Sequence, residues 1–146
     1  MLQIDKLKHD GHINIAVGLS AGSKYWKNTK LLWSELVAKL SEATKTAETY
    51  KQFISASKAD QGKIKDVGGF VGGFLTNGRR NKSDVLYRQL ITLDIDFSHS
   101  DFWWDFTMLF SCAEGIHSTH KSTTAKPRHR LVIPLDIEVS QEEYHV

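Results

Sequence analysis

Hydrophobic and polar residues alternate along the N-terminal third of the chain in patterns that predict one strand and one helix. The apolar run Ile13 to Leu19 is typical of a short buried strand, and residues 20–27 are polar and contain glycine, which predicts a loop. The next apolar residues recur with helical spacing: Leu32, Trp33, Leu36, Val37 and Leu40. This spacing predicts an amphipathic helix that Asn28 or Thr29 caps.

The middle of the chain contains a second helical pattern and a glycine-rich segment. A helix is expected from about Thr46, with Tyr50, Phe53 and Ile54 on one face, and it fades into the polar stretch 57–65. Four glycines follow within six residues: Gly68, Gly69, Gly72 and Gly73. Their spacing matches no known phosphate-binding loop, so we expect a bulged strand that closely approaches another segment, with a phosphate cradle as the alternative. The pair Asn77-Gly78 then predicts a hairpin turn.

The last third is rich in strand patterns around one apolar helix. Residues 85–97 predict a long strand, and the very apolar stretch 101–113 predicts a buried helix whose aromatic side chains belong to the core. Gly115 is expected to end that helix. Two further strands are predicted over 116–120 and 128–135. With no internal repeat and no linker, the pattern indicates a single α+β domain over residues 1–146.

Composition narrows the class of protein. The 146 residues are 40% hydrophobic and carry a net charge of only +2, so nucleic-acid binding cannot be argued from net charge. The one cysteine, Cys112, excludes an internal disulfide and a multi-cysteine zinc site. Charged residues interrupt any signal-peptide pattern over residues 1–20, and no apolar run is long enough to span a membrane. A cytoplasmic protein without membrane partners is expected.

Two aspartates stand two positions apart in the strand predicted over 85–97. Because side chains alternate along a strand, Asp94 and Asp96 share one face, and Leu93 and Phe97 are expected to face a core. Two carboxylates about 6.5–7 Å apart repel each other unless a cation or a base lies between them. Mg²⁺ and Mn²⁺ prefer such oxygen ligands. The pair therefore predicts a divalent-metal site, and an acidic strand end is the alternative.

Basic residues and a histidine follow the aspartates. Ser118 and His120 are expected on one face of their strand and His117 on the other. Arg128 and Arg130 share a face of the next strand, and guanidinium groups grip phosphate oxygens bidentately. We expect these side chains to form one triphosphate site beside the paired acids, although two exposed arginines on an edge strand are common. The predicted nucleotide-binding residues are Ser118, His120, Lys126, Arg128 and Arg130.

A second basic cluster follows the predicted hairpin turn. Arg79, Arg80 and Lys82 are either a solvated turn or an edge that contacts the phosphates of a nucleic acid.

These motifs, in this order, resemble those of the archaeo-eukaryotic primase (primase-polymerase) superfamily. Residues 93–96 (LDID) resemble its hhhDhD motif, and residues 118–120 (STH) resemble its small-x-His motif. The stretch 117–135 resembles the N-terminal primase domain of phage, plasmid and pathogenicity-island replication proteins, often fused to a virulence-associated E type helicase. Residues 33–36 (WSEL) and 64–73 (IKDVGGFVGG) resemble the same subgroup.

The resemblance implies a DNA primase or polymerase domain, a nucleotidyltransferase, from the replication protein of a mobile element. It implies the N-terminal part of the catalytic core, a mixed sheet with flanking helices. Asp94 and Asp96 would bind the catalytic Mg²⁺ or Mn²⁺, His120 would contact the phosphates of the incoming nucleotide, and Arg128 or Arg130 would assist. Nucleoside triphosphates, a DNA template and a helicase domain are the implied partners.

One departure from the resemblance bears on activity. The superfamily has a further metal-binding Asp downstream, in an RRM-like half that we expect to be incomplete here, and Asp136 does not match it. The capping box at 140–143 predicts a helix start with three residues left. We therefore expect either a fragment of a longer primase or a truncated relative that binds a nucleotide, a nucleic acid or a protein. A third hypothesis is a metal-dependent nuclease that uses the same two aspartates.

In such a partial core, some apolar surface is expected to stay exposed unless a protein partner buries it. The strand over 131–135 and the aromatic residues around Trp103 and Phe106 would keep an exposed face. A homodimer or another protein covering that face is therefore a further expectation.

Overall fold

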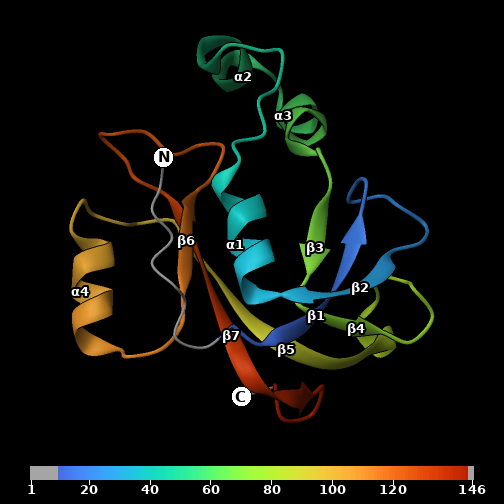
Figure 1. Ribbon diagram of the computed structural model, residues 1–146. Coiled ribbons are helices and arrows are strands. Elements are labelled where there is room, and N and C mark those ends of the chain that lie inside the picture. The colour runs from blue at the N-terminus through green and yellow to red at the C-terminus, as the bar shows by residue number, and fades with distance from the viewer. Residues whose placement is uncertain (1–9, 145–146) are drawn as a thin grey trace.

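The computed structural model describes residues 10–144 (Figure 1). Residues 1–9, which hold most of the charged positions that argue against a signal peptide, and residues 145–146 lie outside the described part. Within residues 10–144, no helix is both long enough and apolar enough to cross a membrane.

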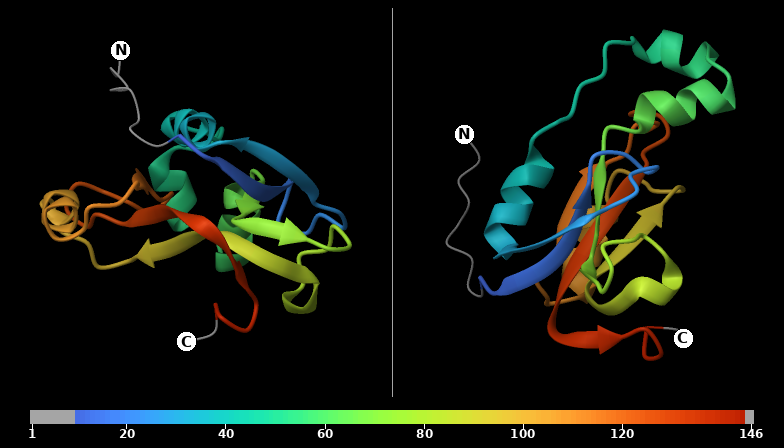
Figure 2. Two further views of the ribbon diagram at one scale, coloured as in Figure 1. Left: turned by 60° about the horizontal axis from the view of Figure 1, so that its bottom comes forward. Right: turned by 90° about the vertical axis from the view of Figure 1, so that its right-hand side faces the viewer.

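The strands form two antiparallel sheets, which Figure 2 shows from two sides. The first sheet has the order β2-β1-β3 and consists of β1 (His12–Gly18), β2 (Lys27–Leu32) and β3 (Gly69–Val71). The second has the order β4-β5-β7-β6 and consists of β4 (Gly73–Leu75), β5 (Val85–Ile95), β6 (Gly115–Ser118) and β7 (His129–Ser140). The predicted α+β class is confirmed, and the described strand pairs are antiparallel rather than mixed.

Helices occupy the connections between the strands. They are α1 (Trp33–Ser41), α2 (Tyr50–Ser55), α3 (Lys58–Lys65), the 3₁₀ turn η1 (Lys82–Asp84) and α4 (Phe102–Leu109). The prediction that Asn28 or Thr29 caps the first helix is wrong, because both residues lie in β2, where pairing with β1 takes their backbone groups. The helix begins at Trp33, and the Glu35 side chain accepts a 2.8 Å hydrogen bond from the backbone N–H of Leu32.

The polar stretch 57–65 is a helix, contrary to the sequence prediction. The Ser57 hydroxyl caps α3 by accepting a hydrogen bond from the backbone N–H of Asp60 at 3.1 Å. No residue of α3 is buried, so the segment has no apolar period from which a helix could be predicted. Its neighbour α2 begins at Tyr50, later than expected, and Thr49 caps it.

The main core joins the first sheet and α1 to the second sheet. It consists of Ile13, Ile15, Leu31, Trp33, Leu36, Leu90 and Val132. A smaller cluster under the first sheet consists of Ala16, Trp26, Val71 and Leu75. Since Leu90 and Val132 lie on the two central strands of the second sheet, one face of β5 and β7 is buried by α1 and the first sheet.

The glycine-rich segment is divided between β3 of the first sheet and β4 of the second, with Gly72 between them, rather than forming the single bulged strand that was predicted. The predicted close approach to another segment is present. A Cβ at Gly73 would lie 2.1 Å from the backbone oxygen of Tyr87, so this backbone approach requires glycine. The β4–β5 register shifts between Phe74 and Leu75. Gly78 has a φ of 61° in the connection between β4 and β5. The two strands pair as a hairpin, but their loop spans residues 76–84 rather than the two residues Asn77-Gly78.

A buried glutamine connects the two sheets at a bulge in β5. The backbone N–H groups of Gln89 and Leu90 both donate to the carbonyl oxygen of Gly72, at 3.0 and 3.2 Å. The Gln89 Oε1 accepts hydrogen bonds from the backbone N–H and the side-chain amide of Asn14 on β1, at 2.8 and 2.9 Å. These hydrogen bonds give partners to the carbonyl oxygen of Gly72 and to the side-chain oxygen of Gln89, which burial would otherwise leave unpaired.

Candidate functional site

Asp94 on β5 faces Arg130 on β7. The two residues are cross-strand partners, so their side chains lie on the same face of the sheet. The guanidinium of Arg130 donates from Nε to Oδ1 at 2.6 Å and from Nη2 to Oδ2 at 3.1 Å, a bidentate pair. These hydrogen bonds hold the pKa of Asp94 below its ordinary value, and the nearby charge of His117 lowers it further.

Asp96 forms a second ion pair directly after the end of β5. Nη1 of Arg128 donates to its Oδ1 at 3.0 Å. The side chains of Asp94 and Asp96 are both 58% exposed, so the two pairs are open to solvent. The sequence predicts that a cation or a base lies between the two carboxylates. In the structure, each carboxylate is neutralised by an arginine: Asp94 by Arg130 of β7, and Asp96 by Arg128, which directly precedes β7.

His117, for which no role was predicted, lies on the face of the sheet that carries Asp94 and Arg130. His117 lies on β6 and is the cross-strand partner of Arg130 on β7, so His117, Arg130 and Asp94 form a row across three strands. Ser118 instead pairs with His129 and therefore lies on the opposite face. His117 and Ser118 lie on opposite faces of β6, as predicted, and the β6–β7 register places Ser118 on the face away from Asp94 and Arg130.

His120 lies outside the strand in which it was predicted, because β6 ends at Ser118. Its ring stands edge-on to that of Phe53, with centroids 4.2 Å apart. Phe53 is the buried residue of α2, so His120 connects the β6–β7 loop to that helix. Its contact with nucleotide phosphates stays a prediction.

The β6–β7 loop carries Lys126 beside a shallow depression rich in hydroxyl groups. Hydrogen bonds of 3.0 Å from the backbone of Lys126 to the Thr123 hydroxyl and from that of Arg128 to the Ser122 hydroxyl order the loop. The depression has a volume of about 460 Å³, and its lining consists of Ser100, Ser118, Ser122, Thr123, Thr124, Pro127 and His129. Lys126 is exposed next to it. Hydroxyl and ammonium groups are suitable donors for phosphate oxygens.

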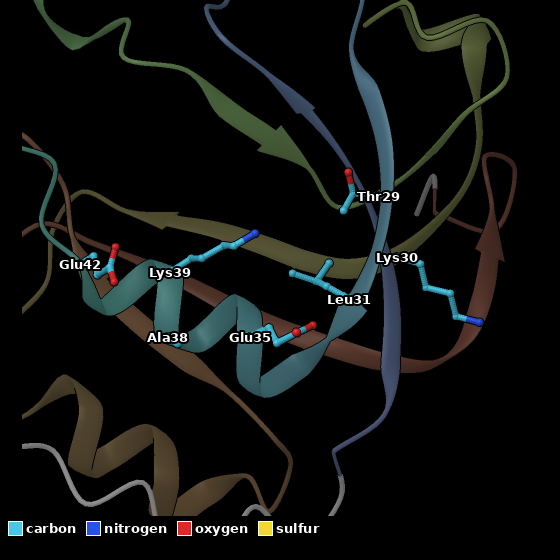
Figure 3. A pocket seen from close by; sticks show the side chains of 7 residues that line it. All are labelled: Thr29, Lys30, Leu31, Glu35, Ala38, Lys39 and Glu42. Atoms are coloured by element: carbon cyan, nitrogen blue, oxygen red, sulfur yellow. The ribbon is translucent and has the colours of Figure 1, made fainter.

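A second groove, of about 450 Å³, lies between β2 and α1 (Figure 3). Its charged lining balances two lysines, Lys30 and Lys39, against two glutamates, Glu35 and Glu42. None of the predicted site residues lines it, so it carries no part of the predicted chemistry.

The apolar helix α4 is not buried as predicted. Its N-terminal aromatic, Phe102, stacks on His129 with centroids 6.5 Å apart, but Trp104 is 67% exposed and α4 contains no buried residue. The helix also ends at Leu109, before the predicted stop at Gly115, which begins β6.

Two apolar side chains next to the carboxylates, one in β5 and one just after it, are likewise exposed. Leu93 and Phe97 were expected to face a core, yet they are 48% and 96% exposed. The main core covers the opposite face of β5 and ends before this part of the strand. Within residues 10–144, Leu93, Phe97 and the outer side of α4 are therefore exposed apolar groups.

Arg79, Arg80 and Lys82 lie at the other end of β5 from the carboxylates. They belong to the connection that precedes Val85, nine residues before Asp94, which places them roughly 30 Å away along the strand. They are therefore not part of the same site.

The two aspartates fit a divalent cation that is held partly by phosphate. Mg²⁺ in nucleotide enzymes is bound through one or two carboxylates together with substrate phosphates. Among the described residues 10–144, none donates a hydrogen bond to the second carboxylate oxygen of Asp96, and both side chains are exposed. Among residues 10–144, no cluster of three or more acidic, histidine or cysteine side chains has the geometry to hold a metal ion.

Comparison with protein families gives one assignment for the whole chain. The model of the VapE N-terminal domain matches residues 1–146. No curated protein and no solved structure matches the chain at a significant level. The match agrees with the predicted N-terminal domain of a mobile-element replication protein. The chain therefore belongs to the family of VapE N-terminal domains, found in VapE-like replication proteins.

Proposed function

We propose that this domain binds a nucleoside triphosphate together with Mg²⁺ or Mn²⁺ on the β5–β7 face that carries Asp94 and Arg130, at the end that the main core leaves open to solvent, as the nucleotide-binding part of a primase-type nucleotidyltransferase. The observation that carries the proposal is the alternation of two carboxylates and two guanidinium groups on that face, in the pairs Asp94–Arg130 and Asp96–Arg128. Carboxylates are ligands for a hard divalent ion, and guanidinium groups are donors to phosphate. One small surface thus contains both kinds of group that a metal–triphosphate complex requires.

The ion pairs determine how the residues would be used. Without a nucleotide, each arginine neutralises its carboxylate. A triphosphate offers the guanidinium groups of Arg128 and Arg130 a more highly charged acceptor, which frees Asp94 and Asp96 to hold the cation. When bound, the cation neutralises the phosphate charge that opposes attack on the α-phosphate. Lys126 and His120 stand on the loop beside Arg128 and are proposed to contact the outer phosphates.

Calorimetry on the intact chain tests this proposal. We expect Mn²⁺ to bind weakly alone and more tightly in the presence of dATP, and we expect D94N/D96N to abolish this binding. The variant D136N/E142Q is the matched control, because it removes two exposed acids from the far end of β7 and the turn that follows it. Equal heats of Mn²⁺–dATP binding for all three proteins would contradict the proposal.

A binding module without full catalysis is the second candidate function. Both carboxylate oxygens of Asp94 are bonded to Arg130, so this site is arranged for charge neutralisation as it stands. Primer extension on a DNA template with Mn²⁺ separates the two candidates. Synthesis that D94N abolishes supports the enzyme, whereas tight Mn²⁺–dATP binding without synthesis supports the binding module.

A further inference from the structure

Two loops that are far apart in the sequence meet at Trp26. The backbone N–H of Trp26, directly before β2, donates to the carbonyl oxygen of Gly78 in the β4–β5 connection at 2.6 Å. The indole is buried against Gly18, where a Cβ would lie 2.5 Å from the ring, and its Nε1 donates to the carbonyl oxygen of Ser23 at 3.1 Å. The two loops are therefore fixed to each other and to the smaller core cluster.

Five cations flank this junction. They are Lys24 and Lys27 from the first loop and the start of β2, and Arg79, Arg80 and Lys82 from the second loop and η1. The guanidinium of Arg80 lies 5.2 Å from the centre of the Trp26 ring. Among residues 10–144, none of the five forms an ion pair with an acidic side chain.

The acid nearest to this cluster in the chain is already bonded. Asp84 accepts hydrogen bonds from the side-chain amides of Asn77 and Asn81, at 3.0 and 2.9 Å, and these bonds lower its pKa. The charge of Arg79 lowers this pKa as well, so Asp84 stays ionised and offsets one of the five positive charges. The cluster keeps a net positive charge that is open to an external anion.

An exposed aromatic ring stands among the cations. Tyr25 is 64% exposed, and the ammonium group of Lys24 lies 5.8 Å from the centre of its ring. Proteins that bind single-stranded nucleic acids combine cations for the phosphate backbone with aromatic side chains on which bases stack. We call the group of Lys24, Tyr25, Lys27, Arg79, Arg80 and Lys82 the Trp26 patch.

We propose that the Trp26 patch binds a single-stranded nucleic acid, with its cations on the phosphates and a base stacked on Tyr25. Because β5 joins the patch to the carboxylate face over roughly 30 Å, the patch is a separate surface. The proposal names the place of the template strand, and in that respect it rests on the proposed function. Its chemistry nevertheless requires neither a metal nor a nucleotide.

Fluorescence anisotropy with a labelled 20-nucleotide oligo(dT), without divalent cations and over a series of NaCl concentrations, tests the role of charge. Single strands lose affinity with salt at a logarithmic slope of about −0.7 per phosphate contacted. The variant R79Q/R80Q/K82Q is therefore expected to lower the magnitude of the slope by about 2. The control K39Q/K51Q/K58Q, which removes three exposed cations from α1, α2 and α3, is expected to keep the slope of the wild type. Equal slopes for the two triple variants overturn the proposal.

The same assay with Tyr25 variants tests stacking. Y25A is expected to bind oligo(dT) roughly five-fold more weakly at an unchanged salt slope, and Y25F is expected to bind like the wild type. If Y25A binds normally and poly-glutamate displaces oligo(dT) as well as unlabelled oligo(dT) does, the surface is one for acidic proteins and the proposal is wrong. D94N/D96N is expected to keep oligo(dT) binding while losing Mn²⁺–dATP binding, so failure of either proposal is seen independently.

Discussion

The strength of the Asp94–Arg130 ion pair determines whether a metal–triphosphate complex can separate the two side chains. The pair is bidentate, which favours a strong interaction, but its side chains are 58% and 41% exposed. Exposed ion pairs contribute about 0.2–1 kcal/mol to stability. Solvent screening therefore limits the coupling between Asp94 and Arg130 to about 1 kcal/mol, the upper end of that range. Such a pair holds the two side chains in place and still yields to a metal–triphosphate complex.

A double-mutant cycle measures this coupling. Urea unfolding of the wild type, D94N, R130Q and the double variant gives the coupling free energy at pH 7 and low salt. Because Arg130 lowers the pKa of Asp94 below its ordinary value of 3.8, the coupling is present above that pH. It is lost as the pH falls through the lowered pKa and the carboxylate becomes protonated. The same cycle in 1 M NaCl is expected to give a smaller coupling.

Two results would refute this reasoning. A coupling of several kcal/mol at pH 7 would mean that the pair is a structural lock, which a ligand could open only at a large cost. A coupling that persists unchanged at pH 2 would mean that it does not depend on the charge of Asp94.

Three further predictions concern the fold and the site. G73A is expected to destabilise the protein by roughly 1–3 kcal/mol in urea unfolding, because its Cβ would meet the backbone of β5, whereas G69A, with no atom within 4 Å, is expected to stay within about 0.5 kcal/mol of the wild type. L90A is expected to cost about 2–5 kcal/mol in the same assay, because Leu90 is fully buried in the main core. R128Q/R130Q is expected to weaken dATP binding in the presence of Mn²⁺ at least ten-fold in calorimetry, because two charged donors to phosphate are lost.

The sequence predicts elements well where an apolar period coincides with burial. The strand over 85–97 and the strands on either side of the Lys121 to Lys126 loop occur close to the predicted positions, because their side chains alternate between two environments. The pattern fails for β2. There the leucine period of the following helix extends backwards, and pairing with β1 overrides it for residues 27–32.

Burial and register are what the sequence could not give. The apolar character of α4 predicts a core helix, but whether a partner surface faces it depends on tertiary structure. Similarly, Asp94 and Asp96 were identified from their spacing, whereas their pairing with Arg130 and Arg128 follows from the β5–β7 register. The role of His117 was missed for the same reason, since a shift of one residue would place it on the other face.

The hydrogen bonds between Gln89 and Asn14 connect β5 of the second sheet to β1 of the first sheet. Sliding one sheet over the other would leave the buried side-chain oxygen of Gln89 without its partners, at a cost of about 1–3 kcal/mol. This penalty favours one alignment of the two sheets and disfavours the neighbouring alignments. Asp94 stands five residues further along the same strand, so its position relative to β1 depends on this alignment. A substitution such as Q89L would therefore disturb the carboxylate face from a distance, without touching any of its charges.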